Sequence, residues 1–327
     1  MSMNTTNENT LAPRAGRINV KMLMQLSLVA LLVVVWTLLS FTTTTFATSG
    51  NITNLLRQTA IGGVLAIGQT FVIITAGIDL SVGSLVAVTG VSLALMVSHG
   101  VPLTLAIVLA LLLGLAAGLI NGFAIHKLGL PPFIATLAML SVARGSALLL
   151  TGGQSISMPT SGFTAFSTTS VWGVPSLFLV LLLVAVVGWV LLHRSRWGRY
   201  VFAYGSNKEA ARLSGVNIGG VVYFVYGFSA LCAAIAGVLV VSRIGVGVPT
   251  AGTGYELDSI AASVIGGASL FGGAGGIFGT ILGALLITTI SNGANLLNVD
   301  PFWQQIITGL LIAVIVFLDQ LRKRREA

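Results

Sequence analysis

Apolar runs recur along almost the whole chain, and short polar segments separate each run from the next. A helix that crosses a bilayer needs roughly 20 predominantly apolar residues. Ten stretches approach or reach that length: residues 22–41, 55–76, 79–98, 103–125, 132–150, 177–193, 219–241, 257–271, 276–293 and 303–320. The pattern predicts an all-α polytopic membrane protein with about ten transmembrane helices, and eight is the alternative count.

Two interruptions leave the count open. The polar segment from Gly77 to Gly83 divides the second run from the third. The glycine-rich segment from Gly272 to Gly276 divides the eighth from the ninth. Each pair of runs forms either a full transmembrane hairpin or a partly re-entrant element, which membranes tolerate only where protein buries the irregular backbone.

Basic residues cluster between runs, where the positive-inside rule uses them to set orientation. With ten spans and a cytoplasmic N-terminus, Lys127, the cluster at 194–212 and Arg322 to Arg325 all fall inside, while Arg57 and Arg243 fall outside. The predicted topology is therefore N-in and C-in. It divides the chain into a polar cytoplasmic tail at 1–21, a transmembrane domain at 22–320 and a basic cytoplasmic tail at 321–327.

Composition narrows the class of protein. Charged residues make up 7% of the 327 residues and hydrophobic residues 55%, whereas soluble domains carry about 25% charged residues. This excludes an ordinary cytosolic enzyme, a disordered protein and a nucleic-acid binder. The basic residues that give the net charge of +8 lie mainly in the clusters that set orientation. The expected surroundings of the chain are therefore the lipid bilayer.

Motifs for chemistry are missing from the sequence. It has no GxxxxGK[ST], GxSxG or HExxH motif, and its single cysteine, Cys232, provides neither an internal disulfide nor a zinc motif. We expect no catalytic residue, no metal site and no cofactor in the chain itself. Any ATP-driven step must then come from another subunit.

Ionisable and amide side chains in or beside the apolar runs are the candidates for a function, because such groups are costly in lipid. The candidates for a pore or a structural motif are Asp79, Ser81, Arg144, Glu256, Asp258 and Asn292. Asp79 is suited to cap the helix that follows it, and Glu256, Asp258 or Ser259 to cap the next one. The sequence leaves structural and substrate-facing roles open for each.

Uncharged polar residues within the runs either line a polar path or form hydrogen bonds between helices. These residues are Gln69, Thr70, Thr75, Asn121, Thr136, Ser141 and Asn292. For any one of them, the interhelical hydrogen bond is the favoured interpretation.

The charged internal segment between the sixth and seventh runs predicts a short helix. Asn207 is suited to cap it, Ala210, Ala211 and Leu213 lie within it, and Gly215 is suited to end it. A helix of about two turns is unstable alone in water, so it must dock. Its partner is either its own bundle and the membrane interface, or a separate cytoplasmic protein.

Several stretches, taken in order, resemble one protein family. They are residues 76–84 (AGIDLSVGS), 133–140 with Arg144 and Gly145, 198–200, 205–215, 249–258 and 291–297. Together they are similar to the permease subunits of bacterial ribose-type sugar ABC importers, over roughly residues 50 to 320. Pentose, hexose and galactoside importers of this type share these motifs.

The resemblance implies a homodimeric pore in the bacterial inner membrane, a periplasmic sugar-binding protein and a cytoplasmic ATPase that holds the ATP. It also implies that the segment 199–218 carries the coupling helix, which rests on the ATPase. The coupling residues it implies are Gly205, Asn207, Glu209, Ala210, Ala211, Arg212, Leu213, Ser214 and Gly215.

Other functions remain as alternatives. A related ABC permease would carry nucleosides or branched-chain amino acids. An ion-coupled secondary transporter would use a buried acid such as Asp79. An intramembrane hydrolase would need Asp79 and Asp258 within reach of each other.

Overall fold

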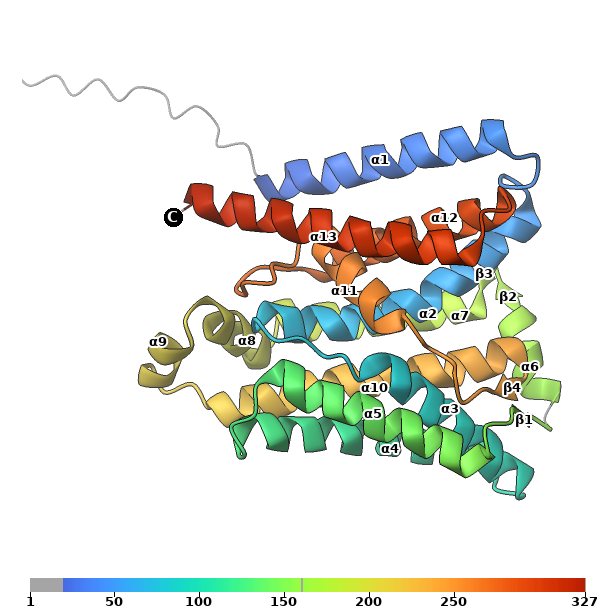
Figure 1. Cartoon of the computed structure of the whole chain (residues 1–327), viewed down its shortest axis with the longest axis horizontal. Coiled ribbons are helices and arrows are strands. Elements are labelled where there is room, and N and C mark those ends of the chain that lie inside the picture. The colour runs from blue at the N-terminus through green and yellow to red at the C-terminus, as the bar shows by residue number, and fades with distance from the viewer. Residues whose placement is uncertain (1–19, 160, 327) are drawn as a thin grey trace, which may run out of the picture.

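The computed structural model describes residues 20–159 and 161–326, and the chain is mostly helical, at 76% (Figure 1). The helices are α1 (Val20–Thr42), α2 (Ser49–Ile74), α3 (Val82–Ser98), α4 (Leu103–His126), α5 (Pro132–Thr151), α6 (Ser161–Thr168), α7 (Ser176–His193), α8 (Arg196–Ser206), α9 (Lys208–Leu213), α10 (Ile218–Ile244), α11 (Tyr255–Ile265), α12 (Ile277–Leu296) and α13 (Pro301–Glu326). The strands are β1 (Ile156–Ser157), β2 (Ser170–Val171), β3 (Val174–Pro175) and β4 (Val246–Gly247).

Within the described residues, seven helices are long and apolar enough to cross a membrane: α1, α2, α4, α5, α7, α10 and α12. The helix predicted at 79–98 begins only at Val82 and has 17 residues. The span predicted at 257–271 is wrong as a helix, because α11 has 11 residues. At 1.5 Å per residue it covers about half of a hydrocarbon core roughly 30 Å thick.

Helices α2 and α10 form the centre of the bundle. Most of their apolar windows are buried, at 83% and 72%, against 22% for α4 and for α5. Helix α10 packs on α2, α3 and α4, and α2 also contacts α7, α11 and α12. Gly114 and Gly118 of α4 lie directly against Ala230 and Ala234 of α10. Small residues permit such close approach, which is the physical basis for the high glycine content.

The two ends of the bundle differ. Helices α8 and α9 lie at one end, together with the start of α1 and the end of α13 (Figure 1). The short strands and α6 lie at the other, where β1 pairs antiparallel with β4 and β2 with β3. The uncharged segment 151–176 builds most of this second end.

The structure describes part of each predicted tail. Residues 1–19 of the predicted N-terminal tail lie outside the described residues. Of the predicted basic tail at 321–327, residues 321–326 continue helix α13.

Candidate functional site

The short helix α9 forms as the sequence predicts. The Oδ1 of Asn207 accepts a hydrogen bond from the backbone N–H of Ala210 at 2.9 Å, and Gly215 adopts a φ of +82° after the helix ends. Only Ala211 of α9 is buried, while Leu213 is 79% exposed. The helix therefore presents an apolar side chain to solvent on a surface that its own bundle does not cover.

The residues that the resemblance assigns to coupling, 205–215, belong to two helices in the structure. The backbone at Asn207 is extended, with φ −161° and ψ 103°, and it separates α8 from α9. Gly205 and Ser206 therefore belong to α8. Helix α8 begins at a cap in which the Oγ of Ser195 accepts from the N–H of Gly198 at 3.3 Å. Tyr204 lies on the same helix, and burial of its side chain raises the pKa of its hydroxyl.

Gly205 is a packing residue. A Cβ at this position would overlap the carbonyl oxygen of Ile74 at the end of α2 and would approach the backbone nitrogen of Gly273. Backbone atoms cannot move aside as a flexible side chain does, so only glycine fits. The contact joins α8 directly to the ends of two other segments.

Both predicted interruptions are non-helical, and they meet at the end of α2. The N–H of Gly273 donates to the carbonyl of Ile74 at 2.9 Å. Ile73 of α2 and Ile260 of α11 share an apolar cluster with Ile78 in the first break. The first interruption is thus mostly buried irregular backbone, which membranes tolerate inside protein, whereas the second is a partly exposed turn between α11 and α12, which pack against each other.

Asp79 anchors the first break. Its Oδ1 accepts from the N–H of Ser81 at 3.0 Å and from the Oγ of Ser81 at 2.6 Å, and its Oδ2 accepts from Ser229 of α10 at 2.9 Å. Asn121 of α4 donates to the Oγ of Ser81 at 3.1 Å. The Gln69 amide, oriented by its hydrogen bonds, pairs with the backbone of Asp79 at 3.2 Å on both sides. Asp79 and Ser81 therefore connect α2, α4 and α10.

Asp258 lies in different surroundings. Asp258 belongs to α11 and lines a pocket. The nearby carboxylate that interacts with it electrostatically is Glu256. Asp79, in contrast, is fully buried with both carboxylate oxygens bonded by serines. The structure does not bring the two acids together as an intramembrane hydrolase would require.

Arg144 of α5 holds the segment that precedes α11. Its Nη1 donates to the carbonyls of Pro249 and Ala251, each at 2.8 Å. The Oε1 of Glu256 accepts from the N–H of Gly254 at 3.3 Å, and Glu256 also lies against Gly83 in the first turn of α3. A carboxylate at this point faces the positive end of the α3 dipole. Arg144 and Glu256 therefore fix one loop.

Asn292 also has a structural partner. Its side-chain amide exchanges two hydrogen bonds with that of Asn51, each at 3.0 Å, and so joins α12 to the start of α2. Two other polar residues proposed for a path also bond a separate segment: the hydroxyl of Thr70 contacts that of Thr280 at 2.7 Å, and Thr136 donates to the carbonyl of Ile78 at 3.2 Å. Thr75 and Ser141 donate to backbone carbonyls of their own helices.

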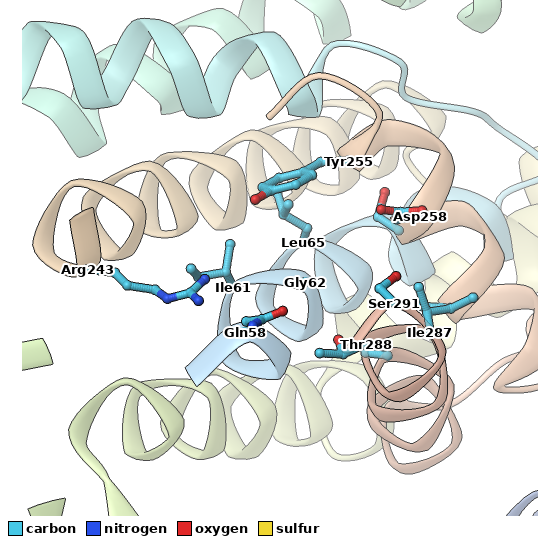
Figure 2. A pocket seen from close by; sticks show the side chains of 13 residues that line it. Gln58, Ile61, Gly62, Leu65, Arg243, Tyr255, Asp258, Ile287, Thr288 and Ser291 are labelled. Atoms are coloured by element: carbon cyan, nitrogen blue, oxygen red, sulfur yellow. The ribbon is translucent and has the colours of Figure 1, made fainter. Parts of the chain in front are cut away.

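A separate pocket lies among α2, α10, α11 and α12 (Figure 2). Three helices each contribute a face with the spacing i, i+3, i+4 and i+7: residues 58, 61, 62 and 65, residues 255, 258, 259 and 262, and residues 284, 287, 288 and 291. Arg243 of α10 completes the lining. Sequence reasoning singled out Asp258 but missed Gln58, Tyr255, Thr288 and Ser291. The available signal was local helical spacing, because Tyr255 lies three positions before Asp258 and Thr288 three positions before Ser291.

Bacterial sugar permeases are similar to this chain along most of its length. The chain is 41% identical over 302 residues to the ribose import permease protein RbsC of Escherichia coli K12, covering 90% of this chain and 93% of that protein. It is 44% identical to RbsC of Bacillus subtilis 168, covering 83% and 84%. It is 39% identical to the D-allose transport system permease protein AlsC of E. coli K12, covering 84% and 85%. No solved structure gives a significant match.

A family model described as the permease component of the branched-chain amino acid transport system matches residues 51–316. The match includes both interruptions, the α8–α9 pair and the pocket. Together with relatives of about 40% identity along most of the chain, it shows that this multi-pass membrane protein belongs to that family of transport-system permease components.

Proposed function

We propose that the chain is the membrane-spanning subunit of an ABC importer for a monosaccharide in the inner membrane. The observation that supports this most strongly is the identity of 39–44% to ribose and allose permeases along most of the chain. The family model names branched-chain amino acids, whereas the compared permeases at this identity are named for ribose and allose. A neutral, hydroxyl-rich substrate also agrees with a bundle whose buried polar groups are mainly amides and hydroxyls.

The proposed partners follow from two surfaces. Exposed Leu213 and the capped helix α9 offer a site for a cytoplasmic ATPase, which binds the ATP. The opposite end, with its short strands and α6, would receive a periplasmic sugar-binding protein. Two copies of the chain would form the pore, and the large apolar faces of α4, α5 and α7 would contact lipid or the second copy.

The orientation has an electrostatic basis. Arg196, Arg199, Lys208 and Arg212 all lie on α8 and α9, and the positive-inside rule assigns such a cluster to the cytoplasm. The described ends of α1 and α13 lie at the same end of the bundle (Figure 1), which supports N-in and C-in. We propose ten crossings, in which irregular backbone completes those of α3 and α11.

A mechanism follows from the contact at Gly205. Closure of the ATPase would displace α9, and α8 would carry the displacement to Ile74 and Gly273 because backbone atoms meet there without a compressible side chain. The end of α2 and the turn between α11 and α12 would move together, since the hydrogen bond between these two residues joins them. The path of the sugar would then close on one side of the membrane and open on the other.

Purification tests the proposal. The tagged chain is extracted from its native membranes in a mild detergent, and co-purifying proteins are identified by mass spectrometry. We expect a stoichiometric ATPase subunit, and we expect vesicles containing the complex and its binding protein to take up D-ribose, D-allose or D-xylose when ATP is added. An intact chain without an ATPase, or uptake that needs an ion gradient, would contradict the proposal and support a secondary transporter.

A further inference from the structure

The pocket among α2, α10, α11 and α12 has polar groups that the protein itself does not satisfy. Within the described residues, the side chains of Gln58, Tyr255, Asp258, Thr288 and Ser291 line the pocket without a hydrogen bond to protein. All five side chains are only partly buried, so they are open to solvent and remain available to a ligand that enters the pocket.

The charges of the pocket favour a neutral ligand. Arg243 and Asp258 lie on opposite sides of it, with the Tyr255 ring between them (Figure 2). One nitrogen of Arg243 donates to the Oδ1 of Asn54 at 3.0 Å, which fixes the guanidinium while leaving other N–H groups. An anion would meet Asp258 and a cation would meet Arg243, so a molecule with one net charge is disfavoured.

The mixture of donors and acceptors fits hydroxyl groups. Arg243 only donates, Asp258 in its ionised form only accepts, and Gln58, Thr288 and Ser291 do both. A hydroxyl also does both, so several adjacent hydroxyls on one small ring would satisfy this set. The ring of Tyr255 and the side chains of Leu65 and Ile287 give apolar surface for the C–H faces of that ring. Few polar groups on an apolar lining are typical of small-molecule sites.

The position of the pocket suits delivery from outside. Gln58 lies in the first half of α2, and Arg243 precedes the end of α10 by one residue, next to β4. Both belong to the half of the bundle that faces the strands and α6, away from α9. In the orientation proposed above, this half faces the periplasm.

We propose that this pocket binds one molecule of the transported sugar inside each protomer, as a resting place early in its passage. The inference rests on the proposed function, since it assumes that the substrate is a sugar. Asp258, Arg243 and Gln58 are the polar contacts, and Tyr255 is the ring-facing residue.

Filling the pocket tests the inference. Ser291→Phe places a ring in the cavity, and Ser40→Phe, at an exposed position of α1, is the matched control. Each variant is reconstituted in vesicles with the ATPase and the binding protein. We expect Ser291→Phe to lower the maximal uptake of the transported sugar at least 10-fold while ATP hydrolysis stays within 2-fold of wild type. Unchanged uptake by Ser291→Phe would overturn the inference and leave the proposed function standing.

Protection of a cysteine from chemical labelling gives a second measurement, which does not depend on whether Ser291→Phe folds. Cys232 is the single cysteine, is buried, and is replaced by alanine to give a cysteine-free background. Thr288→Cys is then labelled with a methanethiosulfonate reagent, and Ser40→Cys serves as the control. We expect the transported sugar to slow labelling of Thr288→Cys at least 3-fold, mannitol to have no effect, and the control to be unaffected.

The outcomes separate the two claims. Equal labelling rates with and without sugar, in a complex that transports that sugar, would overturn the pocket alone. A wild-type complex that takes up no sugar at all would overturn the proposed function and the pocket with it. Protection confined to Thr288→Cys would support both.

Discussion

Gly205 of α8 lies directly against the carbonyl oxygen of Ile74, the last residue of α2. The same carbonyl accepts the hydrogen bond from Gly273. One backbone atom therefore joins the surface helices to the end of α2 and the turn between α11 and α12, and this relationship determines which substitutions should disturb coupling.

Gly205→Ala should uncouple transport. Its Cβ would overlap backbone atoms of Ile74 and approach Gly273, so α8 must move away from the breaks. We expect sugar uptake by the reconstituted complex to fall at least 10-fold while ATP hydrolysis continues. Gly50→Ala is the control, because nothing lies within 4 Å of a Cβ there. Equal uptake by both variants would show that the contact does not transmit motion.

Leu213→Asp should weaken binding of the ATPase. Leu213 is 79% exposed on α9, and burial of a leucine side chain contributes about 1.5–3 kcal/mol. We expect the dissociation constant of the complex, measured in detergent, to rise roughly 10-fold or more. Leu297→Asp serves as the control, since this exposed leucine follows the end of α12, far from α9. An unchanged constant for Leu213→Asp would place the docking surface elsewhere.

Gly215→Pro and Glu209→Lys should also reduce coupling without preventing membrane insertion. Gly215 has a φ of +82°, whereas proline requires a φ near −65°, so the end of α9 must change. Glu209→Lys reverses the charge in the first turn of α9. The measurement compares uptake per ATP hydrolysed, and membrane fractions report insertion. Normal uptake in both variants would contradict the assignment of α9 as the coupling helix.

Arg144→Met should loosen the loop before α11. It removes two hydrogen bonds of 2.8 Å to Pro249 and Ala251, and bonds from a charged group contribute about 1.5–3 kcal/mol each. We expect a lower melting temperature in detergent and faster protease cleavage near residue 250. Arg144→Lys should recover only part of the loss, because an ammonium lacks the planar geometry of guanidinium. Equal melting temperatures of wild type, Arg144→Met and Arg144→Lys would show that these two hydrogen bonds do not stabilise the fold.

Asp79→Ala should destabilise the fold. It leaves two serine hydroxyls and one backbone N–H without their acceptor, at a cost of about 1–3 kcal/mol for each buried group. Asp79→Asn should be milder, because the amide oxygen still accepts from Ser81. We expect Asp79→Asn to retain uptake and Asp79→Ala to melt at a lower temperature. Loss of uptake by a stably folded Asp79→Asn would instead favour an ion-coupled transporter.

The polar residues that interrupt the apolar runs predicted where many of the helices begin and end. Asn207 and Gly215 predicted both ends of α9 because capping and a positive φ are local requirements. The two helix breaks were also visible, since glycine and aspartate interrupt apolar runs. The structure differs at Gly205, which the motif grouped with α9 although it belongs to α8. The reason is tertiary: Gly205 is fixed by Ile74, 131 positions earlier in the chain.

The sequence by itself determined the class of protein, the apolar helices, the short capped helix and the family resemblance, because these depend on composition and on neighbours a few residues apart. Only the tertiary structure decided that Asp79, Arg144 and Asn292 hold segments together, and that Gln58, Arg243, Asp258 and Ser291 meet in one pocket. A polar residue in an apolar run has the same local pattern whether it bonds a neighbouring helix or faces a cavity. The packing of α2, α10, α11 and α12 around it makes the difference.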